Sequence, residues 1–335
     1  MVVVGHNHAA RLHDLTEALL PQLREDDELV IVDNASSDAT AARARAVAPR
    51  ATVLELATNA GFAGGVRAGV TSTAAPLLLL LNPDCQPQPG ALEELRKAAT
   101  EHPDWAAWQA AVMLPDGHIN SSGGVVHFLG MGWAGDCGRP AAALPDEPRE
   151  VAFPSGAAMV VRRSAWDQLD GMEDSYFTYV EDLDLGLRLW LAGLGVGVIP
   201  QARVIHDYDF HKGAAKWFWL ERNRWRTVLA VYPAPLLIAL LPALLAAEIA
   251  LVAVAARQGW LRAKLRAQAA VLVNLPSTLA RRARVQRTRR IGVADFARRL
   301  TASTDSPYLS VGRPAEAAAA AYWALVSGAL ERLGR

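Results

Sequence analysis

The stretch Leu77–Cys85, which reads LLLLLNPDC, decides the fold class of this chain. Five consecutive leucines lack the alternation of a strand with one wet face, so they indicate a strand buried on both faces of a helix-covered sheet. Pro83 cannot continue a hydrogen-bond ladder, so the strand ends near Asn82. Ligands of open α/β sheets bind just beyond the carboxyl ends of strands. Asp84 is therefore a candidate ligand of a divalent cation, although an Asp in Asn-Pro-Asp can equally start a turn.

Short apolar runs alternate with helical patterns around this stretch. The expected strands are Val2–Val4, Glu28–Val32, Ala51–Leu56 and Leu77–Leu81. The expected helices are Leu12–Arg24, Ala39–Ala48 and Phe62–Ser72. This order predicts an α/β fold, doubly wound around a largely parallel sheet. No GxGxxG sequence follows the first strand, so a dinucleotide-binding fingerprint is absent.

Small and polar residues follow each of the first three expected strands. They are His6 and Asn7, then Asp33, Asn34 and Asp38, and then Asn59, Gly61, Phe62, Gly64 and Gly65. Because these strand ends meet at one edge of the sheet, we expect a ligand there, with Asp33 and Asp38 on a nucleoside and backbone near Gly61–Gly65 approaching it closely. The alternative is local: Ser36–Asp38 can cap a helix, and glycines often serve turns.

Residues 102–150 are rich in Gly and Pro, and we expect weak, antiparallel strands there. Trp105, Trp108 and Trp133 lie in this region. A buried core position is favoured for them over an exposed platform that stacks on a sugar. Val151–Arg163 predicts a further strand, broken at Pro154–Gly156.

Three carboxylates crowd the first turn of a helix expected over Val180–Trp190. They are Glu181, Asp182 and Asp184. The helix dipole favours acids at this end, but three together repel one another, which suits a general base or a bound cation. Val196–Ile199 and Arg203–Ile205 are expected to be two short strands. His206 lies at the end of the second, where it can complete a metal site with Asp84.

The charge of the chain is divided between its two parts. Residues 1–200 contain 13 Lys+Arg and 26 Asp+Glu, whereas residues 201–335 contain 21 and 8. This asymmetry predicts a catalytic body, residues 1–215, and a different tail, residues 216–335. The basic residues of the tail adjoin an apolar run, which favours a membrane surface over nucleic acid as the partner. Two cysteines without metal-like spacing suggest a reducing compartment. Because Met1 leads directly into Val2–Val4 without a basic stretch, we expect no export signal.

Six motifs in this order resemble bacterial family 2 glycosyltransferases of the inverting GT-A type, in particular the rhamnosyltransferase-like branch. The segments are Gly5–Asn7, Val32–Asp38, Asn59–Gly65, Leu81–Asp84, Tyr179–Leu185 and His206. The resemblance implies a Rossmann-like mixed sheet with helices on both faces. It also implies metal-dependent, inverting transfer of a hexosyl group from a UDP- or dTDP-type sugar donor. The implied acceptor is a lipid-linked (polyprenyl-linked) or growing cell-surface glycan.

The resemblance also implies roles for single residues. Asp182 matches the catalytic base, with Glu181 and Asp184 beside it. Asp84 matches the last acid of the Asp-x-Asp metal motif, whose first position here is Asn82, and His206 matches a further contact to Mg²⁺ or Mn²⁺ or to diphosphate. The residues expected along the donor are His6, Asn7, Asp33, Asn34, Asp38, Asn59, Gly61, Phe62, Gly64, Gly65, Arg67 and Asn82. Arg67 stands where Asn is more usual and, like Lys212, can reach a phosphate.

Two other functions stay open at this point. One is a catalytically silent protein that binds glycans or nucleotide sugars and has kept the fold. The other is a processive polysaccharide synthase, because Glu221–Trp225 loosely resembles the Gln-x-x-Arg-Trp sequence of such enzymes.

The segment Val228–Ala256 is almost entirely apolar and long enough to span a bilayer. Cations flank both of its ends, so a single span would carry one cluster to the far side, against the positive-inside tendency. We therefore expect a re-entrant hairpin bent near Pro242, or helices lying in the interface, at the cytoplasmic face of the membrane. A buried helical hairpin is the soluble alternative. In each case Glu248 is expected to avoid lipid, and Pro314–Leu333 is expected to form a terminal helix.

Overall fold

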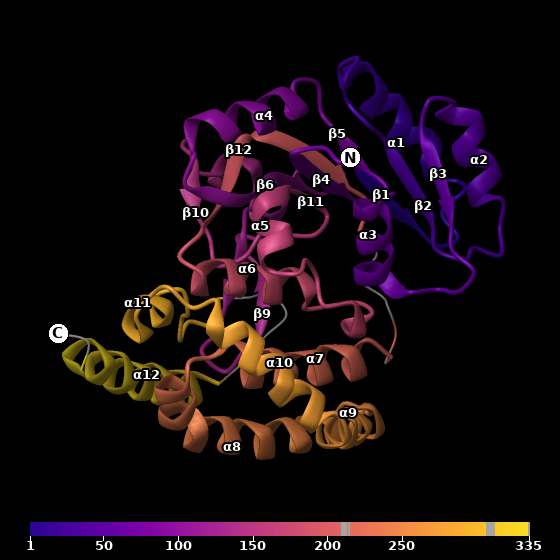
Figure 1. The fold of residues 1–335 in the computed structure, drawn as a ribbon. Coiled ribbons are helices and arrows are strands. Elements are labelled where there is room, and N and C mark those ends of the chain that lie inside the picture. Colours follow the sequence, from indigo (N-terminus) through magenta and orange to yellow (C-terminus); the bar gives the residue numbers. More distant parts are fainter. Residues whose placement is uncertain (209–212, 214, 306–311, 334–335) are drawn as a thin grey trace. The chain divides into compact units, whose positions relative to one another are not determined.

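Figure 1 shows the computed structural model, which describes residues 1–208, 213, 215–305 and 312–333. Lys212, a candidate phosphate contact, lies outside the described residues. The chain forms two compact units. The first comprises residues 1–124, 134–189 and 194–209, and the second comprises residues 125–133, 190–193 and 210–335.

The first four strands of the first unit form the expected parallel arrangement. They are β1 (Val2–Gly5), β2 (Val30–Asp33), β3 (Thr52–Glu55) and β4 (Leu77–Leu81). The helices between them are α1 (Leu12–Leu19), α2 (Thr40–Val47) and α3 (Gly61–Thr71). All seven predicted elements are confirmed. The first helix is shorter than predicted because the chain tightens into a 3₁₀ turn at Leu20–Gln22, where Pro21 stands at the first turn.

The remaining elements complete a mixed sheet of ten strands in the order β10-β12-β6-β11-β4-β1-β2-β3, with β5 on β12 and β7 on β6. Their bounds are β5 (Cys85–Pro87), α4 (Ala91–Glu101), β6 (Trp105–Met113), β7 (Ile119–Ser121), β10 (Arg149–Glu150), β11 (Ala158–Arg162), α5 (Arg163–Gln168), α6 (Glu181–Leu191) and β12 (Gly195–His206). A separate two-stranded sheet pairs β8 (Gly124–Val126) with β9 (Gly132–Ala134). The strand β11 runs antiparallel to both β4 and β6, which makes the sheet mixed.

The expectations about the later strands are confirmed only in part. The short strands β7 and β10 of residues 102–150 pair antiparallel, as predicted. The strand β6 is not weak, because all nine of its residues are buried and it lies between β11 and β12. Eight of these nine residues are apolar, as burial on both faces of a central strand requires. The two short strands expected before His206 are one strand, β12, with a register shift between Ile199 and Arg203. The preference for Trp105, Trp108 and Trp133 in the core is confirmed, because all three are buried.

Helices cover both faces of the parallel part of the sheet. Val3 belongs to one hydrophobic cluster with Leu12, Leu15 and Leu19 of α1. On the opposite face, a Cβ added at Gly69 of α3 would lie 2.4 Å from Val2 Cγ1. A Cβ at Gly65 would similarly lie 2.5 Å from Val4 Cγ1. These glycines allow the close approach of α3 to the chain's own strand β1, which sets the N-terminus of α3 at the strand ends.

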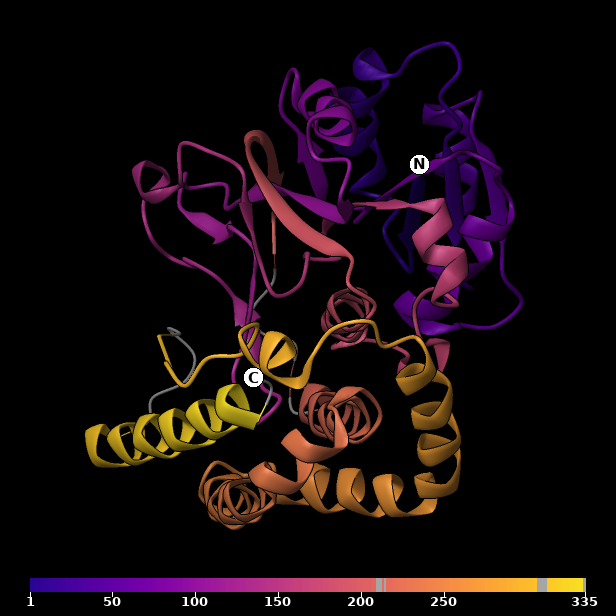
Figure 2. The same ribbon diagram turned by 60° about the vertical axis from the view of Figure 1, so that its left-hand side comes forward.

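The second unit is mainly helical. Its helices are α7 (Ala215–Val231), α8 (Ala234–Arg257), α9 (Leu261–Val273), α10 (Leu275–Arg287), α11 (Val293–Ala297) and α12 (Arg313–Leu333). Both α9 and α10 pack against α7 (Figure 2). The expected terminal helix is confirmed. The expected hairpin bent at Pro242 is wrong, because α8 continues through this residue as one helix of 24 residues. Among the described residues, α8 alone is long and apolar enough to cross a membrane.

A buried cluster of two acids and two cations joins α7, α8 and α9. Arg224 Nη2 lies 2.8 Å from carboxylate oxygens of both Glu221 and Glu248. Lys264 Nζ lies 2.6 Å from Glu248 and also contacts Glu221. Burial raises the pKa of Glu248, but Lys264 and Arg224 outweigh burial and lower it to about 2. Glu248 thus faces the interior of the unit. Glu221 and Arg224, which suggested a processive synthase, belong to the same cluster.

We predict that Lys264→Met destabilises the second unit by about 3–5 kcal/mol, because it leaves the buried Glu221 and the half-buried Glu248 with one cation. The measurement is chemical denaturation followed by circular dichroism. Arg262→Met is the matched control, since Arg262 is exposed on the same helix and its loss should change stability by less than about 0.5 kcal/mol. Equal stabilities of the two variants would contradict a structural role of the cluster.

Candidate functional site

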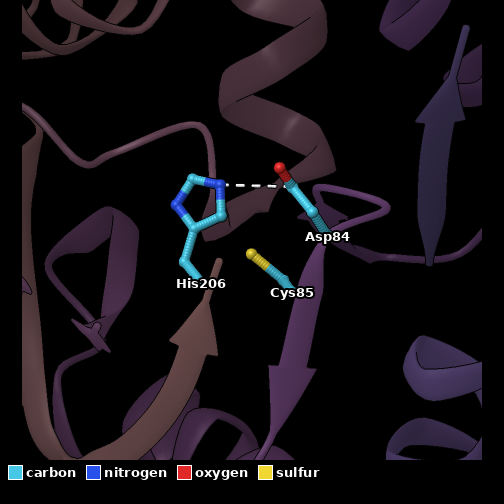
Figure 3. Close-up of side chains that lie close together, drawn as sticks. All are labelled: Asp84, Cys85 and His206. Atoms are coloured by element: carbon cyan, nitrogen blue, oxygen red, sulfur yellow. Dashed lines mark ion pairs between the residues drawn. The ribbon is translucent and has the colours of Figure 1, made fainter. Parts of the chain in front are cut away.

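Strand pairing brings Asp84 and His206 together. The strands β5 and β12 are antiparallel, with His206 opposite Cys85, and the backbone N–H of Asp207 donates to the carbonyl of Asp84 at 3.2 Å. As a result, His206 Nε2 lies 3.1 Å from Asp84 Oδ1 (Figure 3). Asp84 follows the end of β4 and His206 is the last residue of β12, so both lie at the sheet edge where the sequence predicted a ligand.

The Asp84–His206 pair has the chemistry of a cation site. Both atoms that face each other are buried, and neither makes a hydrogen bond of good geometry with a described residue. Buried polar atoms without a hydrogen bond are costly, so a ligand that binds both atoms would stabilise the pair. Burial raises the pKa of Asp84, but the neighbouring His206 outweighs it and the net shift is downward, which favours the carboxylate. A carboxylate oxygen and an imidazole nitrogen suit a divalent metal ion.

Cys85 lies beside this pair but has a different environment. Its sulfur and the ligand atoms of Asp84 and His206 all lie within 4.8 Å of one another. The thiol, however, donates to the carbonyl of Ala157 at 3.3 Å and belongs to the hydrophobic core. Burial raises the pKa of this thiol well above its ordinary value, which favours the neutral form. The proximity of Cys85 to His206 has no signal in the sequence, because it arises from the pairing of β5 with β12.

The segment Gly156–Ala157 connects the metal candidate to the acid cluster. The N–H of Asn82 donates to the Ala157 carbonyl at 2.9 Å, and the N–H of Gly156 donates to Asp182 Oδ2 at 3.0 Å. A Cβ added at Gly156 would lie 3.2 Å from the Phe62 ring and 3.6 Å from Asp182 Oδ2. The sequence pattern predicts only a strand break at Gly156, although a glycine inside a strand pattern also indicates the close approach of another segment.

The carboxylates of Glu181 and Asp182 have different surroundings. Asp182 accepts backbone hydrogen bonds from Gly156 and, at 2.7 Å, from Leu183. Glu181 is buried, and its Oε2 has no hydrogen-bond partner among the described residues. Burial raises the pKa of both groups, and the charge of Asp182 raises that of Glu181 further. Because the two N–H donors favour an ionised Asp182, we assign the shared proton to Glu181.

Asp184 has a structural environment. It is fully buried, and its carboxylate accepts from Arg188 Nε at 2.7 Å and from the Tyr176 hydroxyl at 3.2 Å. The guanidinium of Arg188 also donates to the carbonyls of Leu169 and Gly171. This network ties the helix α6 to the chain that precedes it. Of the three acids at the start of α6, Asp184 is therefore the one already paired with a buried cation.

The backbone just before α6 is strained. Phe177, Tyr179 and Val180 have φ values of 67°, 66° and 72°, although none is a glycine. Such conformations cost about 1–3 kcal/mol each and cluster at functional sites. The carbonyl of Phe177 accepts from the N–H of Ala63 at 3.3 Å. Gly61 is required here, because its φ is +72° and a Cβ would lie 2.2 Å from the Phe177 oxygen. The start of α3 and the start of α6 therefore fit together.

Hydrogen bonds join the ends of β1 and β2. The side-chain oxygen of Asn7 accepts from the N–H of Ser37 at 2.8 Å, and His6 Nδ1 lies 2.9 Å from the Asn34 carbonyl. The N–H of Asn34 donates to the Gly5 carbonyl at 2.8 Å. The residues proposed for a nucleoside thus lie on two adjoining loops.

The two aspartates of the second loop make local hydrogen bonds. Asp33 Oδ1 accepts from the N–H of Ser36 at 3.0 Å. Asp38 accepts from Thr40 and, at 3.2 Å, from the N–H of Ala9. The Thr40 hydroxyl lowers the pKa of Asp38. These contacts agree with the turn and capping alternative for both residues, and they leave room for a ligand at the remaining oxygen lone pairs.

Asn34 and Asn59 support the turn before α3. Asn34 accepts from the N–H of Ala60 at 2.8 Å and donates to the Gly61 carbonyl at 2.9 Å. Asn59 Oδ1 accepts from the N–H of Gly61, also at 2.8 Å. A Cβ added at Gly64 would lie 2.7 Å from Ala60 Cβ, so close packing also constrains this position. Arg67 farther along α3 is engaged as well, because its guanidinium donates to Asp170 and to the Met172 carbonyl.

Two family profiles match the chain. The profile described as Glycosyl transferase family 2 matches residues 1–121. The profile described as Glycosyl transferase family group 2 matches residues 79–281, which is more than half of the chain.

Curated relatives include two rhamnosyltransferases. The N-acetylglucosaminyl-diphospho-decaprenol L-rhamnosyltransferase of Mycobacterium tuberculosis H37Rv is 28% identical over 229 residues, which cover 62% of this chain and 75% of the relative. The rhamnosyltransferase WbbL of Escherichia coli K12 is 38% identical over 75 residues, which cover 22% of this chain and 27% of the relative.

Solved structures share the fold at low sequence identity. GalNAc-T7, solved with UDP, GalNAc and Mn²⁺, has a TM-score of 0.57 at 14% identity. The match covers 70% of this chain and 48% of GalNAc-T7. Residues 1–349 of TarS from S. aureus, solved with UDP, have a TM-score of 0.52 at 14% identity, and the match covers 100% of this chain and 91% of TarS. These likenesses establish the GT-A fold of the chain.

The raised pKa of Glu181 predicts a pH-dependent stability. Above pH 4.5, the ordinary value, the unfolded chain releases this proton while the folded chain keeps it. The free energy of unfolding should therefore fall by about 1.4 kcal/mol per pH unit until the folded-state pKa is reached. Glu181→Gln cannot ionise at this position, so its free energy of unfolding should not show this fall. The difference in stability in favour of the variant should therefore grow as pH rises. Parallel stability curves from chemical denaturation would contradict the assignment of the proton to Glu181.

Proposed function

Because this chain belongs to glycosyltransferase family 2, we propose that it transfers a sugar from a nucleotide-diphosphate donor to a polyprenyl-linked or growing surface glycan. The observation that carries the proposal is the link from the Asp84–His206 pair through Gly156–Ala157 to Asp182. A cation candidate and a base candidate then flank one segment. The name of the M. tuberculosis relative, a rhamnosyltransferase for a decaprenol-linked substrate, supports the class of acceptor.

In this proposal Asp84 and His206 hold a divalent metal ion. The buried Oδ1 and Nε2 atoms, which face each other without a hydrogen bond, fit that role. A bound Mg²⁺ or Mn²⁺ supplies positive charge that stabilises the diphosphate leaving group. Asn82, in the position of the first acid of the motif, would contribute a neutral amide, so Asp84 carries the only carboxylate of this motif.

Asp182 acts as the general base. Its carboxylate takes the proton of the acceptor hydroxyl while the hydroxyl oxygen forms a bond to the anomeric carbon. The bond from that carbon to the diphosphate oxygen breaks on the opposite face, so the anomeric configuration inverts. The backbone donors of Gly156 and Leu183 orient the carboxylate and keep it ionised. Glu181 stays protonated and does not compete for the acceptor proton.

The donor nucleoside lies along the loops after β1 and β2. His6, Asn7, Asp33 and Asp38 are the candidate contacts, and the Asn59–Gly65 turn extends along the sugar diphosphate. A UDP or dTDP donor is proposed, as in the UDP-containing structures that share the fold. Asn34 and Arg67 support these loops from within the protein. Residues 216–335 would associate with the cytoplasmic face of the membrane, where polyprenyl-linked acceptors reside.

The experiment that tests the function uses purified full-length protein with a panel of nucleotide sugars and a polyprenyl-diphosphate-linked acceptor. Release of nucleoside diphosphate together with an extended acceptor of inverted linkage is the expected result. Donor binding without release would favour a silent binding protein. Addition of many sugars to one acceptor before its dissociation would favour a processive synthase.

We predict that Asp182→Asn lowers kcat by about 10²–10⁴-fold with nearly unchanged donor affinity, because the amide keeps the shape but accepts no proton. Glu181→Gln is the matched comparison. It resembles the protonated acid and should retain most of the activity. If Glu181→Gln were the more damaging variant in steady-state kinetics, the two roles would have to be exchanged.

We predict that Asp84→Ala lowers the affinity for Mn²⁺ by more than about 10-fold, because removal of a first ligand should cost at least as much as removal of an outer partner. Calorimetric titration measures this affinity independently of turnover. Chelator should abolish transfer by the unmodified protein, and Mg²⁺ or Mn²⁺ should restore it. Asp182→Asn is the control and should bind Mn²⁺ normally. Unchanged Mn²⁺ affinity in Asp84→Ala would refute the metal assignment.

A further inference from the structure

One face of the helix α8 is exposed in the part of the chain that the structure describes. Ile238, Leu241, Leu245 and Ile249 are between 50% and 74% exposed. Their spacing of three and four residues places them on one stripe of the helix. Between Ala234 and Ala256 the sequence contains a single charged residue, Glu248. The exposed stripe is therefore continuous and apolar, which is unusual for a surface that meets water.

The opposite face of α8 packs against the rest of the second unit. Leu236, Leu240 and Leu244 are fully buried. Glu248 extends to Arg224 and Lys264, as described above, and also accepts from Gln268 at 2.7 Å. These contacts set the rotation of α8 about its own axis. Because they hold one face inward, the apolar stripe on the other face is exposed.

The neighbouring helix α9 exposes a mixed stripe. Leu265, Leu272 and Val273 are at least 50% exposed, and Arg262 and Arg266 are exposed on the same helix. Long arginine side chains can lay their apolar stems along a hydrophobic surface while the charged ends remain in a polar layer. Arg257 adds a further exposed cation at the end of α8. From residue 228 to residue 290 the only acid is Glu248, which the ion pairs neutralise.

We propose that the outward stripes of α8 and α9 form a docking surface for an anionic lipid bilayer, with α8 lying in the plane of the membrane rather than across it. The apolar stripe enters the boundary between headgroups and acyl chains, and Arg257 and Arg262 contact lipid phosphates. The inference deepens the proposed membrane association but needs no sugar transfer for its test.

A transmembrane orientation conflicts with the contacts of Glu248. A helix of 24 residues is long enough to cross a bilayer, and composition alone would allow it. In a span, however, hydrocarbon would surround the whole helix. The carboxylate would then either leave Arg224 and Lys264 or draw α7 and α9 into the membrane with it. In-plane insertion keeps every contact of the buried face and exposes only the apolar stripe to lipid.

The orientation is tested with single fluorescent labels on the full chain. Labels are attached at Ile238→Cys and at Ile249→Cys in a Cys137→Ser background, in which Cys85 is buried. The two positions are eleven residues apart, or about 16 Å along the helix axis. Quenching by lipids brominated at different depths should place both labels at the same shallow depth. Depths that differ by about the helical distance would establish a span and overturn the proposal.

The surface itself is tested by vesicle flotation. Arg257→Gln with Arg262→Gln should lower partition into phosphatidylglycerol vesicles by about 10-fold at low salt. The matched control is Arg43→Gln with Arg50→Gln, which removes the same charge from exposed positions of the first unit and should leave partition unchanged. If both double variants lost partition equally, the net charge of the protein and not the position of the arginines would explain the loss, and the assigned surface would be wrong. Full-length protein that stays off vesicles and forms a dimer through α8 would also overturn it, because a second copy would cover the stripe.

Discussion

The pairing of β5 with β12 is the constraint on which the candidate site depends. The chain leaves the central strand β4 at a proline and returns only three residues later as β5. That short strand lies antiparallel to the end of β12 and sets Asp84 against His206, which are 122 residues apart in the sequence. The two side chains meet because their backbones share a ladder. The strand pairing by itself places the two side chains next to each other.

Close packing at glycines positions the other half of the site. Gly65 and Gly69 let α3 approach β1, and Gly61 lets its first turn approach the carbonyl of Phe177. Gly156 has a different part, because its N–H orients the Asp182 carboxylate while the absence of a side chain leaves room for Phe62. The glycines of the Asn59–Gly65 turn, which the sequence suggested for ligand binding, are thus required by close packing within the protein. Any contact of this turn with the donor depends on that packing.

In the second unit, an apolar helix is held by buried charges. The helix α8 is almost entirely apolar, and its one internal charged residue, Glu248, pairs with cations of α7 and α9. The pairing of Glu248 with Arg224 and Lys264 fixes the rotation of α8 and thereby the direction of its apolar stripe. A buried ion pair adds little stability by itself, but breaking it is expensive, so it restricts the orientations that the helix can adopt.

The sequence alone determined the order of elements in residues 1–81, because leucine and valine runs between turn residues have few alternative structures. It also determined which strand ends carry polar groups, and six short motifs identified the family. Only the tertiary structure decided that β6 is a central strand, because its position depends on its pairing with β11 and β12. It alone placed the guanidinium of Arg188 against the carbonyls of Leu169 and Gly171 and placed Gly156 against Asp182. These contacts join residues far apart in the chain or with no periodic pattern. Local sequence specifies periodicity and turns, whereas such contacts arise when the whole sheet is assembled.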